Sequence, residues 1–169
     1  MAQLSNCQMC SLSKDREHVS FSRGNKPASV MIVFNREPKS DSHKLLLLDF
    51  IRQLNYELKH DFYYTFAIKC FQEKQKINVT HIQKCRAWLK SEIVSVEPEL
   101  VVLMGSLAKI MVLGGKYRDM LQPNIFYTKD SKTGGKKEFF IGENIMGNRA
   151  KVETNLSKLL THIRAMYNG

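Results

Sequence analysis

Apolar residues in this sequence follow two patterns: short continuous runs, and longer stretches in which they recur every three or four positions. The short runs are rich in β-branched and aromatic residues, and they predict buried strands over residues 29–34, 61–70, 99–105, 124–128 and 137–142. The longer stretches predict helices over residues 45–58, 79–96 and about 151–167. Because strands alternate with helices, we expect an α/β fold, a three-layer α/β/α arrangement around a central, mostly parallel four-stranded sheet.

Capping and stop residues refine these boundaries. We expect Ser42 to cap the first long helix, and either Asn78 or Thr80 to cap the second. A short helix is predicted over residues 106–115, where two glycines end it. The chain has no internal repeat and no linker-like segment, so we expect a single domain over residues 1–169.

The charge balance points to a polyanionic partner. Lys and Arg total 26 against 16 Asp and Glu, a formal net charge of +10 on a chain of 169 residues. Such an excess favours DNA or RNA as the partner. No apolar run approaches the roughly 20 residues that a membrane helix needs, so we expect no membrane partner. The first residues do not resemble a secretory signal, and we expect an intracellular protein, cytoplasmic or nucleoid-associated.

The cysteines suggest a metal site. Cys7 and Cys10 form a C-x2-C pair near the start of the chain, and Cys70 and Cys85 follow after 59 and then 14 intervening residues. Disulfides are not expected in a reducing compartment. Together the cysteines would supply four thiolates, a ligand set that suits either Zn²⁺ or an iron–sulfur cluster.

After Cys7 and Cys10 come Arg16, Val19-Ser-Phe21 and Gly24-Asn25. This order resembles the segment before the first strand of the iron–sulfur uracil-DNA glycosylases, known as family 4. The second strand ends in Tyr63-Tyr-Thr-Phe-Ala-Ile-Lys-Cys70, which is similar to the family's Tyr-x-Thr-Asn-x-x-Lys-Cys. The segment Cys85-Arg-Ala-Trp-Leu-Lys-Ser-Glu-Ile93 matches the family's Cys-x-x-Trp-Leu-x-x-Glu-Ile. The resemblance covers about the first two-thirds of the chain.

This resemblance implies a uracil-DNA glycosylase-like fold, a DNA partner and a [4Fe–4S] cluster. The cluster would be held by Cys7, Cys10, Cys70 and Cys85. Its implied role is structural, because it would tie the N-terminal arm to the second strand and the following helix. Zinc remains the alternative metal.

The resemblance fails at the positions where the family carries its chemistry. Asn35 and Glu37 stand in place of the family's Gly-Glu-x-Pro-Gly motif, with both glycines lost and the carboxylate out of register. Phe66 replaces the asparagine that reads uracil, and it has no hydrogen-bonding group. Glu143 follows the last strand where the family has a His-Pro motif, and a carboxylate there would repel the uracil anion. We therefore assign no catalytic residue and treat these four positions as a degenerate pocket.

The remaining candidates are DNA contacts. A helix N-terminus at Gly105 and Ser106 suggests a phosphate contact, to which Lys109 would add charge unless it lies on a solvated face. Trp88 is expected in the core. A basic loop that follows residue 128 would contact the DNA backbone through Lys132, Lys136 and Lys137.

These observations favour a DNA-binding protein that has lost uracil excision and acts as an accessory to a polymerase or another replication or repair protein. One alternative is an active DNA glycosylase of altered base specificity, with a pocket rebuilt around Glu37 and Glu143. A second is a protein-interaction subunit that no longer binds DNA. The small size and the eroded motifs would also suit a protein encoded by a virus.

Overall fold

The computed structural model describes residues 2–74, 76–117, 119, 124–129 and 135–168. Its main sheet has six strands in the order β2-β4-β3-β6-β8-β7. The inner strands β4 (Phe62–Phe66), β3 (Val30–Phe34), β6 (Leu100–Met104) and β8 (Lys136–Gly142) run parallel to one another. The predicted four-stranded parallel core is therefore present.

Two antiparallel edge strands extend this core. The predicted strand near residue 124 is β7 (Asn124–Lys129), which forms a hairpin with β8. At the opposite edge, β2 (Arg23–Gly24) pairs with β4 and was not predicted. A separate two-stranded sheet joins β1 (His18–Val19) to β5 (Cys70–Phe71). The prediction of one long strand over residues 61–70 is therefore wrong, because the chain leaves the main sheet after Phe66 and pairs again only at Cys70.

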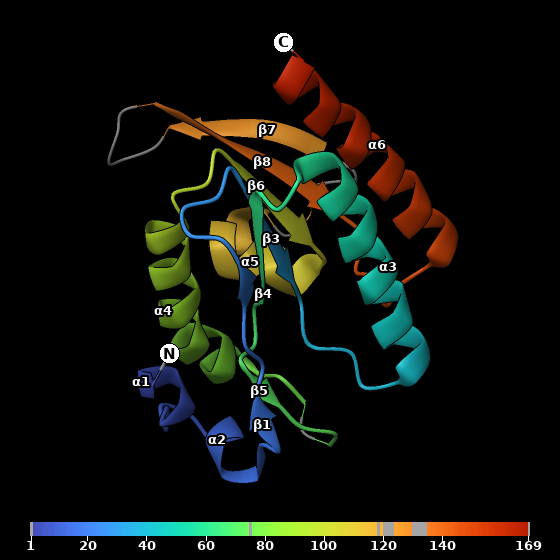
Figure 1. Ribbon diagram of the computed structural model, residues 1–169. Coiled ribbons are helices and arrows are strands. Elements are labelled where there is room, and N and C mark those ends of the chain that lie inside the picture. The colour runs from blue at the N-terminus through green and yellow to red at the C-terminus, as the bar shows by residue number, and fades with distance from the viewer. Residues whose placement is uncertain (1, 75, 118, 120–123, 130–134, 169) are drawn as a thin grey trace.

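Helices cover both faces of the sheet (Figure 1). One face packs against α3 (Asp41–Leu58) and α6 (Arg149–Asn168), and the other packs against α4 (Val79–Val96) and α5 (Ser106–Leu113). Within β3, alternate side chains join the two apolar clusters, so all five of its residues are buried. A strand buried on both faces explains the continuous apolar runs in the sequence.

Capping decides where the long helices begin. Ser40, not the predicted Ser42, caps α3, because its side chain accepts the backbone N–H of His43 at 3.3 Å. Asn78 caps α4 by accepting the backbone N–H of His81 at 3.0 Å, and the His81 ring bonds back to the Asn78 N–H. α3 therefore starts four residues before the predicted boundary at Leu45, since an exposed polar turn precedes its first apolar residues.

Short elements complete the chain. An N-terminal arm, residues 2–24, carries α1 (Ala2–Ser5), α2 (Leu12–Asp15), β1 and β2, and the turn after α5 contains a 3₁₀ helix (Gly115–Tyr117). Figure 1 shows α1 and α2 beside one end of α4, next to β1 and β5. Among the described helices, none combines the length and the apolar character needed to span a bilayer.

Candidate functional site

The N-terminal arm is held against α4 and β5 by polar contacts. The Ser11 hydroxyl lies 2.8 Å from Nε2 of His81, a buried residue of α4. Arg16 donates to the carbonyl of Cys7 at 2.8 Å. In the β1–β5 ladder, Val19 lies opposite Cys70. The arm thus brings Cys7 and its neighbour Cys10 to the region that already contains the other two cysteines.

The four cysteines are free thiols. Cys70 and Cys85 are buried, whereas Cys7 and Cys10 are half-buried. Cys10, Cys70 and Cys85 belong to the same apolar cluster between the sheet and α4. Among the described residues, no group of three or more Cys, His, Asp or Glu side chains stands in an arrangement that would hold a metal ion.

Two side chains donate hydrogen bonds to these sulfurs. The indole N–H of Trp88 lies 3.3 Å from Sγ of Cys7, and the guanidinium of Arg16 lies 3.7 Å from Sγ of Cys70. Such donors stabilise the thiolate relative to the thiol, and the thiolate is the form that binds a metal. Trp88 was predicted to be a core residue, but it is only half-buried, and no sequence pattern indicated its contact with Cys7, which lies 81 positions away.

The thiols also influence one another electrostatically. Burial raises the pKa of Cys85 to about 11; the backbone N–H and the charge of Lys69 lower it, and Cys70 and Cys10 raise it. Burial likewise raises the pKa of Cys70, which Arg16 lowers and Cys10 and Cys7 raise. The pKa of each buried thiol is therefore raised by two other cysteines. By residue type the four thiols suit a four-thiolate group, and a metal bound there would have to displace the protons that burial retains on Cys70 and Cys85.

A buried ion pair lies beside Cys85. Lys69 Nζ is 2.5 Å from a carboxylate oxygen of Glu92, and the two side chains are 2% and 13% exposed. Thr65 and Tyr63 donate to the same carboxylate at 3.1 and 2.9 Å. Burial lowers the pKa of Lys69, and the Glu92 carboxylate opposes that shift. No sequence pattern indicated that Glu92 would join one network with Tyr63, Thr65 and Lys69, which all lie more than twenty positions before it.

At the carboxyl ends of the parallel strands, two aromatic residues fill the space with core packing. Phe34 ends β3 and is fully buried, and its ring centroid lies 6.0 Å from that of Phe66 and 5.7 Å from that of Phe50. Phe66 is 5% exposed and belongs to the cluster under α3 and α6. Both side chains therefore pack inside the protein.

Asn35 is used as a cap for another element. Its side-chain oxygen accepts the backbone N–H of Ala108 in the first turn of α5 at 2.9 Å. The N-cap residue of α5 is Gly105, which has a φ of 117°. A Cβ at Gly105 would come within 2.5 Å of the Asn35 carboxamide, so this position requires glycine for space as well as for backbone conformation. Asn35 thus occupies one of the backbone N–H groups of α5 that a phosphate would need.

The two carboxylates of the predicted degenerate pocket lie in different loops. Glu37 accepts the Ser20 hydroxyl at 2.6 Å and lies 3.0 Å from Nε2 of His18, so it is tied to the N-terminal arm. Glu143 lies in the loop after β8, where its side chain is close to Gly147. Its backbone N–H donates to the side chain of Asn155 at 2.8 Å.

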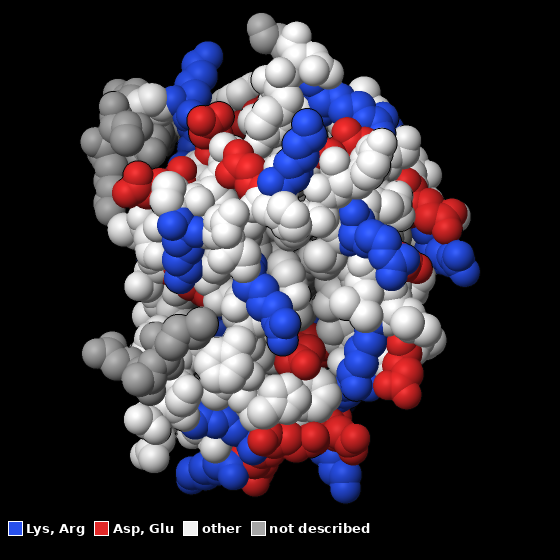
Figure 2. Space-filling view, viewed as in Figure 1, with Lys and Arg blue, Asp and Glu red and all other residues white. Residues whose placement is uncertain are grey.

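The predicted DNA contacts are dispersed. Ser106 is exposed, but Lys109 is only 2% exposed, so the alternative of a solvated face is wrong for Lys109 and its ammonium does not reach the surface as a phosphate contact. Lys136 is exposed and lies over the ring of Tyr127, 5.8 Å from its centroid. Lys137 is half-buried in β8, and Lys132 lies outside the described residues. On the face shown in Figure 2, basic side chains are interspersed with acidic and uncharged ones.

The comparisons with known proteins agree with this architecture. The family model of the uracil DNA glycosylase superfamily matches residues 14–162. A comparison with curated proteins finds no match. The chain therefore belongs to the uracil DNA glycosylase superfamily. This membership and the observed layers confirm the predicted α/β fold with its mostly parallel central sheet.

Proposed function

We propose that this protein is an iron–sulfur DNA-binding member of the superfamily that has lost uracil excision and acts as an accessory in DNA replication or repair. The observation that carries the proposal is the internal use of the side chains at the carboxyl ends of the parallel strands. Phe34 and Phe66 pack in the core, and the Asn35 carboxamide caps α5. In open parallel sheets, this edge is where ligands bind.

Loss of excision follows from the chemistry that base removal needs. A glycosylase must hold a flipped base by hydrogen bonds to its edge and stabilise the negative charge that leaves with it. The phenyl ring of Phe66 offers no donor or acceptor. Glu143, after β8, would bring a second negative charge toward a leaving anion. Neither residue supports the uracil reaction.

Binding of a [4Fe–4S] cluster is supported by the kind of ligand that the four cysteines supply. In the part of the chain that the structure describes, they do not form a closed coordination shell. Cys7, Cys10, Cys70 and Cys85 would hold it, with Trp88 and Arg16 donating to the sulfurs. The cluster would act as a cross-link between the N-terminal arm, β5 and α4. Zinc, which the same four thiolates also suit, is the competing metal.

DNA binding is supported by superfamily membership and by the net charge of +10. Ser106 at the exposed start of α5 and Lys136 at the start of β8 are the described candidates for phosphate contacts. Phosphate contacts release counterions, so their contribution weakens as salt rises.

One experiment tests binding and excision together. The protein, purified without oxygen, is mixed with duplex and single-stranded DNA carrying uracil, and both binding and strand cleavage after alkali are measured at 50 and 200 mM salt. We expect binding that weakens steeply with salt, together with no cleavage. Cleavage of uracil DNA would refute the loss of excision, and the absence of salt-sensitive binding would favour a protein-interaction subunit.

The metal is tested separately. Iron, acid-labile sulfide and zinc are measured in protein purified without oxygen, alongside Cys70→Ala. We expect about four iron and four sulfide per chain, the content of a [4Fe–4S] cluster, and loss of both in the variant. Stoichiometric zinc without sulfide would replace the cluster with a structural zinc site. The absence of both would refute the metal centre.

A second candidate function, a glycosylase of altered specificity, is favoured by one observation. Glu37 and His18 form a hydrogen-bonded pair at 3.0 Å, with side chains that are 27% and 48% exposed. A carboxylate that orients an imidazole can move a proton. Duplexes carrying a panel of modified bases test this candidate. Cleavage of one of them that is lost in Glu37→Gln would establish it, and no cleavage of any would exclude it for that panel.

A further inference from the structure

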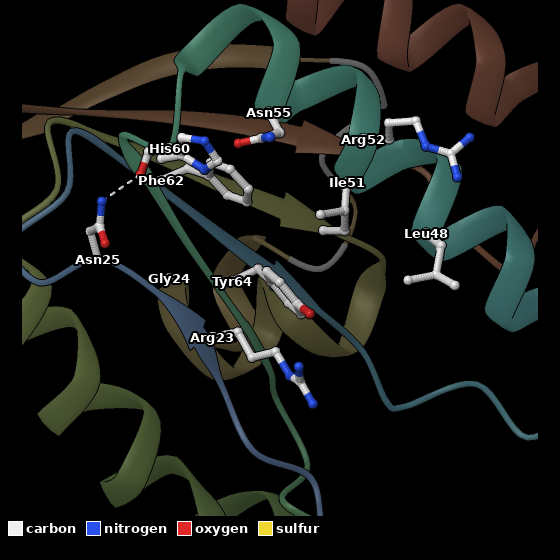
Figure 3. Close-up of a pocket in the computed structure, with 10 residues that line it drawn as sticks. All are labelled: Arg23, Gly24, Asn25, Leu48, Ile51, Arg52, Asn55, His60, Phe62 and Tyr64. Carbon is white, nitrogen blue, oxygen red and sulfur yellow. Dashed lines mark hydrogen bonds between the residues drawn. The ribbon is translucent and has the colours of Figure 1, made fainter.

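A cavity of about 410 Å³ lies between α3 and the edge of the sheet formed by β2 and β4. It is distinct from the strand ends described above, because it adjoins the first half of β4 and the turn before that strand. Its walls combine basic, aromatic, aliphatic and amide side chains, drawn in Figure 3. The residues that line it are Arg23, Gly24, Asn25, Leu48, Ile51, Arg52, Asn55, His60, Phe62 and Tyr64.

The aromatic wall comes from β4. Phe62 and Tyr64 alternate along the strand and therefore share the face that points to α3. Their rings are close to parallel, with centroids 6.5 Å apart and an angle of 18° between the planes. Ile51, from α3, contributes an aliphatic side chain to the same cavity. A flat apolar ligand could be held against this wall.

The basic groups come from two elements that flank the aromatic wall. Arg23 lies opposite Tyr64 in the β2–β4 ladder, and Arg52 projects from α3 (Figure 3). Both arginines are exposed, and the nearest partner of Arg52 is Asp49, at 3.1 Å on the same helix. Among the described residues that line the cavity, none carries a carboxylate. The site therefore favours an anion, for which the planar guanidinium is suited when the anion is a phosphate.

A side-chain oxygen without a hydrogen-bond partner among the described residues completes the site. The side-chain oxygen of Asn55 is buried and has no hydrogen-bond partner among the described residues. Buried polar atoms are rarely left without a partner, so this oxygen is suited to accept a hydrogen bond from a ligand. Asn55 lies one helical turn from Arg52 and beside Phe62 and His60 in Figure 3. A donor on the edge of an aromatic ring would satisfy it.

We propose that this cavity binds one nucleotide unit, with the base against Phe62 and Tyr64, the base edge at Asn55, and the phosphate between Arg23 and Arg52. A base supplies the flat apolar surface and the edge donor, and its phosphate supplies the negative charge. The unit is either a free nucleotide or one residue of a single strand. This site is independent of the proposed function, since it uses neither the cysteines nor the strand ends.

The test is calorimetric titration of the intact protein with dAMP, dCMP, dGMP and dTMP, and with a short single-stranded oligonucleotide. We expect saturable binding that is weakened about tenfold by Arg52→Gln or by Tyr64→Leu. Arg149→Gln is the matched control. Like Arg52, Arg149 is an arginine paired with a carboxylate on its own helix, and the Arg149 side chain is 77% exposed against 79% for Arg52. Arg149 does not line the cavity.

The outcomes separate the two sources of the ligand. Binding of mononucleotides assigns a free nucleotide, whereas binding of the oligonucleotide alone assigns a strand, and both support the site if the cavity variants weaken it and Arg149→Gln does not. Equal binding of ribose 5-phosphate, which lacks a base, would overturn the proposal. So would binding that Arg52→Gln and Tyr64→Leu leave unchanged, or no binding of either probe. Thermal unfolding of each variant shows whether it is folded.

Discussion

The cysteine region and the carboxyl ends of the parallel strands use their polar groups in opposite ways. Around the cysteines, Trp88 and Arg16 donate to sulfurs, and the four thiols form no disulfide. At the strand ends, the Asn35 carboxamide already caps a helix, and Phe66 is core. The first region has thiols that an external group could bind, whereas the second uses its side chains for packing and capping. This contrast supports the proposal that the protein binds DNA without excising bases.

The largest expected effect tests how much the buried ion pair beside the cysteines contributes to stability. Glu92→Ala would leave the ammonium of Lys69 buried without its carboxylate, and breaking such a pair costs about 3–5 kcal/mol of unfolding free energy. Urea denaturation measures the loss. Glu153→Ala, which breaks an exposed pair with Arg149, is the control and should cost less than about 1 kcal/mol. A loss of similar size in both variants would contradict the structural role of the buried pair.

The next effect tests whether the strand ends are closed. Phe66→Asn restores the residue that the glycosylase resemblance expects for reading uracil. We expect a loss of about 3 kcal/mol in unfolding free energy and no uracil excision, because the change removes buried aromatic packing and buries an amide. Phe66→Leu separates the two causes, since it keeps the site apolar and should cost less. A stable Phe66→Asn variant that cleaves uracil DNA would show that the pocket is open.

A smaller effect tests the donors to the sulfurs. Trp88→Phe removes the N–H that lies 3.3 Å from Sγ of Cys7 but keeps most of the ring packing. Loss of an outer hydrogen bond to a metal ligand weakens metal affinity by about 10–100-fold. Competition between a chelator and the protein for Co²⁺, which gives thiolate complexes a visible absorption, measures this change. Equal affinity in the variant and the original protein would mean that the bond has no role in metal binding.

The smallest effect concerns the cap on α5. Asn35→Ala leaves the backbone N–H of Ala108 without its acceptor and should cost about 1 kcal/mol of unfolding free energy. Asn35→Asp keeps an acceptor at the same position and should retain most of the stability. Thermal unfolding measures both. If the two variants were equally stable, Asn35 would not act as a cap, and its side chain would not be committed to stability at the strand ends.

The long apolar patterns predicted most of the fold because they follow directly from burial. Runs such as Val30–Phe34 can be continuous only when both faces of a strand are covered, and the spacing of Cys85 and Leu89 already marks the inner face of α4. β2 escaped prediction because two residues at a sheet edge carry no periodic signal. The long strand predicted over residues 61–70 failed for a related reason: composition shows where β-forming residues lie and does not show where a strand changes partners.

The candidate site was predictable to a lesser degree. The four cysteines, and a phenylalanine at position 66 where the glycosylase resemblance expects an asparagine, are visible in the sequence as single residues with known chemistry. The burial of Lys109 was not, because a lysine in a short helix is ordinarily solvated and only the packing of α5 against the sheet shows otherwise. The role of Asn35 was also hidden, since its partner lies 73 residues away.

By itself, the sequence determined the order of the main strands and the long helices, the excess of positive charge and the set of thiols, because each depends on residue type and local spacing. The tertiary structure alone decided which groups meet. It paired Lys69 with Glu92, brought the Asn35 side chain to the first turn of α5, and brought Arg23 and Arg52 to one cavity. Contacts between distant segments depend on how the layers pack, and no local pattern records that packing.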